Sequence, residues 1–327
     1  MPYTAHDPVY LSALSPRDAR FDQRKAETEK FCLLYQLSGY QGYFERMRHC
    51  APFLDFIVEI REDGVLIPKL QGADFCRVRL CPTCQWRRSV MWQAKAFEMI
   101  PKVIEDYPKA RFIFLTLTVK NCELNNLRNT LAWMHDSWRK LVKRKEFKPV
   151  QGWIRSVEVT RSSEDTAHPH YHALLMVNEG YFKRGYVSQK RWSEVWQDCL
   201  GVEYSPIVDV RLVRPGKAEK GSEGVLMASA ICEVVKYSVK PSECLRENTG
   251  FHMTNQQWLA GLTEQLFKTR AIATGGVLRK YLSDLEKEPE DLIHADEDGY
   301  TPVDDKSARA GFSWHRSLNR YVMVDPI

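Results

Sequence analysis

The sequence lacks any long apolar run, although 44% of its 327 residues are hydrophobic. No stretch approaches the 18 uninterrupted apolar residues that a membrane-spanning helix needs, so no membrane segment is expected. The first twenty residues contain no basic region followed by an apolar block, and we therefore expect no secretory signal. The cytoplasm is the expected location.

A nucleotide-binding loop and internal repeats are missing as well. The pattern G-x-x-x-x-G-K-[ST] occurs nowhere, which excludes a Walker-type ATPase. The pair Gly275–Gly276 predicts a tight turn and not a phosphate loop.

Disulfide bonds are not expected, because the nine cysteines are an odd number in a chain without an export signal. Three of them form a C-x4-C-x2-C run: Cys76, Cys81 and Cys84. The turn Cys81-Pro-Thr-Cys84 presents two thiolates to one ion, which predicts a structural zinc site. The alternative is a set of buried free thiols. For the fourth ligand we favour Cys50, with His49 and Cys32 behind it.

Acidic residues are concentrated in one segment. Ser283–Asp305 contains ten of them and one lysine, a local charge of −9. Because the whole chain has a net charge of +5, the remaining residues carry +14. A basic body with an acidic tail is typical of a nucleic-acid binder, although a merely solvated basic face has the same charge. The candidate nucleic-acid contacts lie on two predicted helices: Arg87, Arg88, Arg139, Lys140, Lys143 and Arg144.

Four β-branched or alternating segments predict strands, and the helices between them predict an α+β fold. The strands are expected at residues 111–120, 151–160, 168–177 and 207–213, and a hairpin is expected at 53–67. The expected domains are a polar arm at 1–30, a helical and zinc-knuckle region at 31–105, a catalytic domain at 106–245, a helical extension at 246–282 and an acidic tail with little predicted order at 283–327.

The strand at 168–177 begins with histidines at alternate positions. Because side chains alternate faces along a strand, His170 and His172 point the same way and Tyr171 points to the opposite face. Two imidazoles on one rigid face form a platform for a divalent metal. The alternative is a histidine-rich turn before a buried strand.

A third metal ligand is expected on the neighbouring strand. Residues 151–160 and 168–177 should pair as an antiparallel hairpin, which places Glu158 across from the histidines. Two imidazoles and one oxygen ligand suit Mg²⁺ or Mn²⁺ and leave positions open for a phosphate oxygen. We rank Glu158 above His168 as this ligand, although Glu158 can also be an ordinary surface residue.

A second constellation lies on the predicted helix 228–240. Glu233, Tyr237 and Lys240 are spaced to share one helical face. A tyrosine with a cation and a carboxylate one turn away on either side is typical of an activated nucleophile with a spare base. A simple polar edge of an amphipathic helix has the same pattern.

Taken together, these motifs resemble the rolling-circle replication initiators of small plasmids. These proteins belong to the HUH endonuclease superfamily, and the resemblance is to the single-tyrosine subgroup with a zinc knuckle. It covers roughly residues 50–281. It rests on three motifs in consistent order: Phe114–Thr118, His168–His172 and Glu233–Lys240. The cysteine run and the late turn at 273–278 fit as well.

The resemblance implies an HUH-type catalytic domain, in which helices flank a central antiparallel sheet and the histidine strand is central. A zinc knuckle lies N-terminal to this domain, and a helical part follows it. It implies a metal-dependent endonuclease and strand transferase that nicks and rejoins DNA through a 5′-phosphotyrosine intermediate. Tyr237 would be the nucleophile, Lys240 would neutralise developing charge, and Glu233 would activate water at termination.

The implied partners are plasmid origin DNA, single-stranded or extruded at the nick site, and a host polymerase. Because no ATPase motif is present, the duplex would be opened by supercoiling or by a host helicase. Two other functions remain open: a non-enzymatic, zinc-dependent DNA-binding regulator, and an HUH-type transposase or relaxase.

Overall fold

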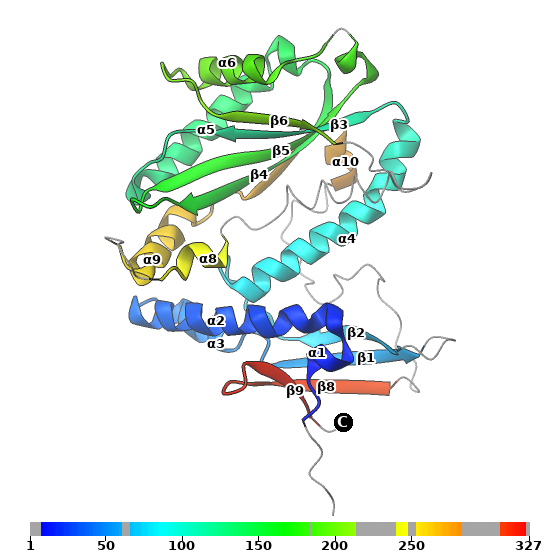
Figure 1. The fold of residues 1–327 in the computed structure, drawn as a ribbon, viewed down its shortest axis with the longest axis vertical. Coiled ribbons are helices and arrows are strands. Elements are labelled where there is room, and N and C mark those ends of the chain that lie inside the picture. Colours follow the sequence, from blue (N-terminus) through cyan, green and yellow to red (C-terminus); the bar gives the residue numbers. More distant parts are fainter. Residues whose placement is uncertain are drawn as a thin grey trace, which may run out of the picture. The chain divides into compact units, whose positions relative to one another are not determined.

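The structure is a computed structural model that describes residues 8–60, 66–183, 185–213, 240–247, 253–282 and 308–324 (Figure 1). The chain divides into two compact units, Met1–Met91 with Glu290–Ile327 and Trp92–Pro289. The long helix α4 (Pro82–Asp106) contributes residues to both. Each unit contains one antiparallel sheet and several helices, so the predicted α+β class is confirmed.

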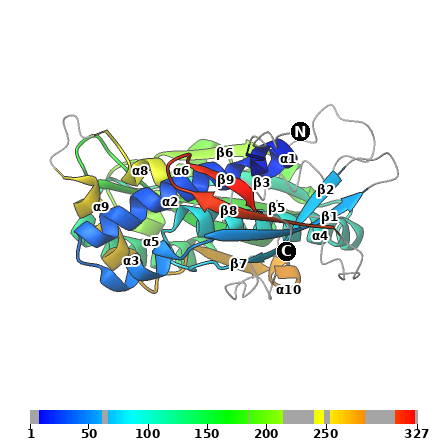
Figure 2. The same ribbon diagram turned by 90° about the horizontal axis from the view of Figure 1, so that it is seen from below.

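The sheet of the first unit has the strand order β2-β1-β8-β9 (Figure 2). Strands β1 (Phe53–Ile60) and β2 (Leu66–Ala73) form the predicted hairpin. Strands β8 (Ala308–His315) and β9 (Arg320–Val324) come from the other end of the chain, and β8 pairs with β1. Besides the start of α4, the helices among the described residues of this unit are α1 (Leu11–Leu14), η1 (Pro16–Ala19), α2 (Arg20–Leu37) and α3 (Gln41–Arg48).

The two chain ends of this unit differ from the expected polar arm and acidic tail. Tyr10 forms an isolated β-bridge with Val322, and Asp22 accepts a hydrogen bond from the Tyr321 backbone N–H at 2.8 Å. The rings of Phe21 and Tyr321 are buried and lie 6.1 Å apart. These contacts join residues about 300 positions apart, so local composition carries no signal for them. The acidic run itself, 283–305, lies outside the described residues.

The sheet of the second unit has the order β6-β3-β5-β4-β7, with the histidine strand β5 (Ala167–Val177) at its centre. Its neighbours are β3 (Arg111–Thr118) and β4 (Val150–Arg161), and β4 pairs with β5 as the predicted antiparallel hairpin. Strand β6 (Val208–Leu212) lies at one edge and β7 (Ile272–Gly276) at the other. Because β7 pairs with β4, the expected C-terminal extension is part of this sheet.

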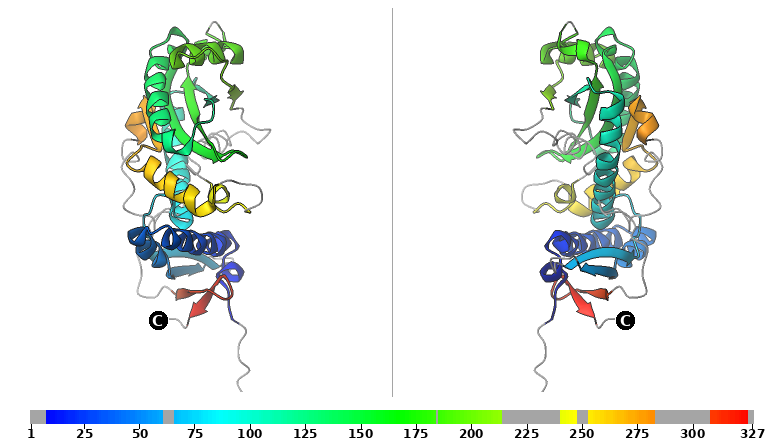
Figure 3. Two further views of the ribbon diagram at one scale, coloured as in Figure 1. Left: turned by 90° about the vertical axis from the view of Figure 1, so that its left-hand side faces the viewer. Right: turned by 90° about the vertical axis from the view of Figure 1, so that its right-hand side faces the viewer.

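Helices cover one face of this sheet (Figure 3). Helix α5 (Leu127–Leu141) packs against the face that carries Tyr171, whose ring lies 6.1 Å from that of Trp138. The other helices among the described residues of the unit are η2 (Leu124–Asn126), η3 (Lys145–Phe147), η4 (Glu179–Phe182), α6 (Gln189–Leu200), α8 (Pro241–Cys244), α9 (Asn255–Leu266) and α10 (Leu278–Leu282). His170 and His172 project from the opposite face, because side chains alternate along the strand.

None of the helices in the described part of the chain is both long enough and apolar enough to span a bilayer.

Candidate metal centres and active site

Glu158 lies directly opposite His170 across the β4–β5 pair. Its Oε2 atom is 3.0 Å from Nε2 of His172 and 3.5 Å from Nε2 of His170. The potential ligand atoms of these three residues lie within 4.8 Å of one another. Antiparallel register produces this cluster, because paired residues of adjacent strands project from the same face.

The three side chains fit one divalent ion. Burial raises the pKa of Glu158, but hydrogen bonds from His170, His172 and Lys240 outweigh it and hold the pKa well below its usual range. The group is therefore a carboxylate at neutral pH, as a metal ligand must be. Two imidazoles and one carboxylate on a single face leave further coordination positions open to a substrate oxygen.

Two groups hold the imidazoles so that Nε2 of each turns toward Glu158. Thr116 on β3 pairs with His172, and its Oγ1 lies 3.2 Å from Nδ1 of that ring. Nδ1 of His170 lies 3.2 Å from the carbonyl oxygen of His168. Such partners fix the orientation and tautomer of metal-binding histidines. The sequence analysis placed Thr116 in the Phe114–Thr118 motif but did not predict this contact. The alternating threonines of β3, which share one face of the strand, are the sequence feature that could have indicated it.

His168, the alternative third ligand, has a different partner. Its Nδ1 lies 2.8 Å from Oδ1 of Asn121, in the segment that follows β3. Burial lowers the pKa of His168, and the neighbouring His170 lowers it further. His168 therefore favours the neutral imidazole, and its contact extends the cluster toward the end of the sheet.

Lys240 completes the arrangement from a distant part of the chain. Its Nζ lies 2.9 Å from Oε1 of Glu158, and about half of its side chain is exposed. The structure thus places Lys240, the last residue of the Glu233–Lys240 motif, in contact with the cluster formed by Glu158 and the histidine motif. Glu233 and Tyr237, the other residues of that motif, lie outside the described residues.

The four predicted cysteines form a second cluster. The Sγ atom of Cys50 lies 3.6 Å from that of Cys81 and 3.7 Å from that of Cys84, and Cys76 Sγ lies 3.5 Å from Cys84 Sγ. A tetrahedral zinc ion with Zn–S bonds of about 2.3 Å requires S–S separations of roughly 3.8 Å. These cysteines therefore fit zinc. Cys32 donates instead to the carbonyl of Phe44 at 3.5 Å.

Helix α2 lines the cysteine cluster with two buried polar residues. The hydroxyl of Thr28 lies 3.6 Å from Sγ of Cys81, and the ammonium of Lys25 donates to the carbonyl of Cys50 at 2.7 Å. A hydroxyl near a thiolate can donate to it and stabilise its charge, while the Lys25 bond fixes the backbone at Cys50. The N-terminal helix, expected to be part of a polar arm, thus builds the surroundings of the cluster.

The predicted nucleic-acid contacts divide into two groups, and Arg87 requires a correction. Arg87 is 1% exposed and lies between aromatic rings, with its Cζ 5.6 Å from the centroid of Phe21. Packing of α4 against α2 buries it, so it is not on a surface that DNA can reach. Arg88 donates to the carbonyl of Arg77 at 3.0 Å at the exposed edge of the same segment.

The basic end of α5 is not beside the histidines. Arg139 pairs with Asp136 at 2.5 Å, Arg144 pairs with Asp198 at 3.0 Å and Lys140 donates to the carbonyl of Cys199 at 3.4 Å, while Lys143 is exposed. Helix α5 packs on the sheet face that carries Tyr171, whereas the histidines project from the opposite face. DNA contacts at these residues would therefore lie on the other side of the sheet from the cluster.

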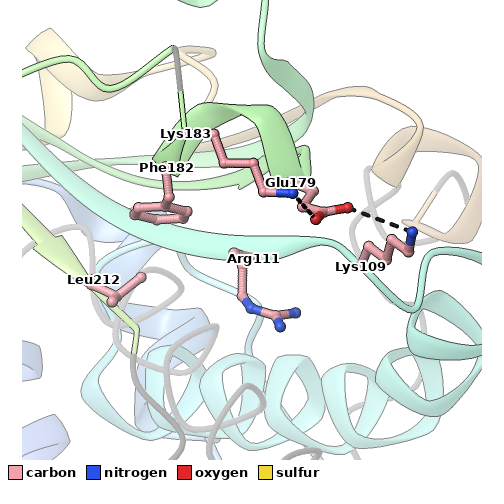
Figure 4. A pocket seen from close by; sticks show the side chains of 6 residues that line it. All are labelled: Lys109, Arg111, Glu179, Phe182, Lys183 and Leu212. Carbon is pink, nitrogen blue, oxygen red and sulfur yellow. Dashed lines mark hydrogen bonds and ion pairs between the residues drawn. The ribbon is translucent and has the colours of Figure 1, made fainter.

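A basic hollow of about 400 Å³ also lies away from the histidines (Figure 4). It is bordered by Lys109, Arg111, Glu179, Phe182, Lys183 and Leu212. Glu179 pairs with both lysines, at 3.6 Å for Lys109, so their charges are largely compensated. Arg111 pairs with Val177 at one end of β3, whereas Thr118 pairs with His170 at the other. The hollow is therefore not part of the histidine cluster.

Comparison with known proteins identifies the family. Residues 67–322 match the replication protein family, and the chain belongs to it. It is 36% identical over 292 residues to protein rep of Streptococcus pneumoniae serotype 2, with 86% of this chain and 85% of the relative covered. It is 34% identical over 331 residues to protein rep of Bacillus amyloliquefaciens, with 94% of each chain covered. No solved structure matches the chain. The membership confirms the resemblance to replication initiators that the motifs indicated.

Proposed function

We propose that this protein starts and ends rolling-circle replication of a plasmid by nicking and rejoining DNA at the origin. The observation that carries the proposal is the contact of Lys240 with Glu158 within the histidine cluster. Tyr237 precedes Lys240 by three residues, and three residues of chain span at most about 11 Å. The chain therefore tethers a candidate nucleophile close to a candidate metal centre.

Each side chain has a separate task in this reaction. The phenolic oxygen of Tyr237 bonds to phosphorus, the bond to the 3′ oxygen breaks, and that oxygen takes up a proton and leaves as a hydroxyl. An ordinary tyrosine has a pKa near 10 and is a weak nucleophile at neutral pH. Lys240 lowers this barrier by favouring the phenolate or by neutralising charge on the phosphate. Glu233 activates the water that ends the cycle.

Glu158, His170 and His172 would hold Mg²⁺ or Mn²⁺. The ion, when bound, polarises the scissile phosphate and stabilises negative charge on its oxygens. The four cysteines would hold Zn²⁺, with a structural role, because a set of four thiolates leaves no open position for substrate.

The substrate would be origin DNA that is single-stranded or extruded at the nick site. A host polymerase would extend the free 3′ hydroxyl, and supercoiling or a host helicase would open the duplex. The exposed Lys143 and the half-buried Arg88 would contribute salt-dependent phosphate contacts.

A nicking assay tests the proposal. Supercoiled plasmid that carries the gene and its origin is incubated with the protein and Mn²⁺, and relaxation and a protein–DNA adduct are measured. The wild-type protein should relax the plasmid and form the adduct, and Tyr237→Phe should do neither. Tyr281→Phe, a change at a half-buried tyrosine whose hydroxyl donates to Asp106, serves as the control and should retain both activities.

Zinc content shows whether the histidines and the cysteines form separate metal sites, and adduct formation separates this function from the alternatives. The double variant His170→Ala/His172→Ala should lose nicking and keep its zinc. If wild-type protein binds the origin duplex and never forms an adduct, the chain is a zinc-dependent DNA-binding regulator instead.

A further inference from the structure

A hollow of about 510 Å³ lies at the end of the sheet, next to the histidine cluster. The residues that border it come from the segment after β3, from η2 and α5, and from the segment after α6: Lys120, Asn121, Cys122, Asn126, Asn129, Thr130, Trp133 and Tyr204. The volume is within the usual range for small-molecule sites, about 300–1,000 Å³, and is large enough for a nucleoside.

One side chain links this hollow to the metal centre. Asn121 borders the hollow, and its Oδ1 lies 2.8 Å from Nδ1 of His168. Its amide nitrogen donates to the Thr166 hydroxyl at 3.1 Å, at the start of the histidine strand. Cys122 and Ala167 exchange two backbone hydrogen bonds, of 2.8 and 2.9 Å, which fix the segment against β5. Asn121 therefore connects the hollow directly to His168 of the histidine motif.

The lining combines two aromatic rings with amide groups and one cation. The ammonium of Lys120 lies 4.5 Å from the centroid of the Tyr204 ring, and the Tyr204 hydroxyl accepts from the Lys120 backbone N–H at 3.2 Å. Trp133 is fixed by donation from its indole N–H to the carbonyl of Leu200 at 3.1 Å. Lys120 is exposed, and it has no carboxylate partner among the described residues. A phosphate can therefore draw this ammonium away from the Tyr204 ring, and that ring face then opens to a base.

The amides of Asn126 and Asn129 supply hydrogen-bonding groups at the wall of the hollow. Asn129 donates to Asn126 at 3.1 Å, and both side chains are exposed. An amide offers a donor and an acceptor side by side, which suits the edge of an unpaired base. Aromatic rings that stack bases, amides that read base edges and a cation for the backbone are the usual components of a single-strand site.

We propose that this hollow binds an unpaired base of single-stranded DNA next to the scissile phosphate. Tyr204 stacks on the base, Asn129 contacts its edge and Lys120 pairs with the adjoining phosphate. The inference rests on the proposed function for the identity of the substrate, and it adds a base-reading subsite to the cutting centre. The hollow of Figure 4 fits less well, because Glu179 compensates its lysines.

The test measures binding without cleavage. Fluorescein-labelled 12-mers are titrated with the full, zinc-loaded chain in buffer without added Mg²⁺ or Mn²⁺ and followed by anisotropy. One is dA12, and the other carries the same phosphates on abasic sugars. The wild-type protein should bind dA12 more tightly than the abasic strand. Tyr204→Ala should weaken dA12 binding roughly tenfold, the scale of one base–aromatic stack, and leave abasic binding unchanged.

The controls keep the inference apart from the proposed function. Tyr186→Ala changes a tyrosine that is 65% exposed and does not border the hollow, and it should bind both strands as wild type does. His172→Ala should lose nicking and keep the preference for dA12. The inference is overturned if Tyr204→Ala binds dA12 as wild type does, or loses both strands equally. If the inference is overturned in this way but the wild-type protein nicks DNA, the proposed function still stands. If the wild-type protein does not nick DNA but its preference for dA12 depends on Tyr204, only the proposed function is overturned.

Discussion

The ammonium of Lys240 lies 2.9 Å from Oε1 of Glu158, and Oε2 of the same carboxylate lies 3.0 Å from Nε2 of His172. One glutamate therefore connects the two histidines on β5 with the last residue of a motif some 70 positions later. A bound cation would compete with Lys240 for this carboxylate. We expect Lys240 then to turn to the substrate phosphate, where it is proposed to act.

Glu158→Gln should abolish metal binding at this cluster. The amide keeps the size of the side chain and loses the negative charge that a divalent cation requires, so Mn²⁺ affinity and nicking should each fall by about 100-fold or more. Titration of Mn²⁺ followed by electron paramagnetic resonance measures the affinity. Glu179→Gln, at the hollow of Figure 4, is the matched control and should bind Mn²⁺ normally. Normal Mn²⁺ affinity in Glu158→Gln would remove this residue from the ligand set.

Thr116→Val should weaken metal binding without removing a ligand. The substitution keeps the shape of the side chain and removes the hydroxyl that lies 3.2 Å from Nδ1 of His172. Loss of such a partner typically lowers metal affinity by about 10- to 100-fold. The control is Thr118→Val, whose hydroxyl donates to the carbonyl of Ile207 at 2.8 Å and not to a histidine. Equal Mn²⁺ affinities for the two variants would contradict a positioning role for Thr116.

Cys50→Ser should release one zinc ion per chain and destabilise the unit that holds the cysteines. Loss of a structural metal site costs more than about 3 kcal/mol of folding free energy. Zinc content by mass spectrometry and chemical denaturation measure the two effects. Cys32→Ser is the control, since that thiol donates to a backbone carbonyl outside the cluster, and it should retain zinc. Zinc loss from Cys32→Ser and not from Cys50→Ser would reverse the assignment.

Glu146→Gln should flatten the dependence of stability on pH under acidic conditions. Burial raises the pKa of Glu146, but the Arg191 guanidinium at 2.7 Å outweighs burial and lowers the pKa below its usual range. The pair therefore stabilises the folded state above the unfolded pKa near 4.5, and this contribution is lost as the pH falls through the lower folded pKa.

The effect of Glu146 is measured by urea denaturation between pH 6 and pH 3. One titrating group changes the free energy of unfolding by at most about 1.4 kcal/mol per pH unit. Glu194→Gln is the control, because Glu194 pairs with the same arginine at 3.0 Å while 45% exposed, and solvent screens that pair. A pH profile of Glu146→Gln that matches wild type would show that the pair does not contribute.

Much of the second unit could be predicted from local patterns. The strands at β3, β4 and β5 are long and rich in β-branched and aromatic residues, and the short polar stretch between β4 and β5 indicated a hairpin. Once that hairpin is accepted, alternation places His170 and His172 on one face and Glu158 across from them. The cysteine spacing likewise predicted three ligands of the second cluster.

The sequence by itself determined the residue types and their order: two histidines on one strand face, a carboxylate on the next strand and three thiols spaced for one ion. Tertiary structure alone decided the pairing of β8 with β1, the burial of Arg87 among aromatic rings, and the contacts of Thr116, Asn121 and Lys240 with the histidine cluster. The physical reason is distance along the chain. Periodicity and turn chemistry act over a few residues, whereas these contacts form only when segments tens to hundreds of residues apart bury a common core.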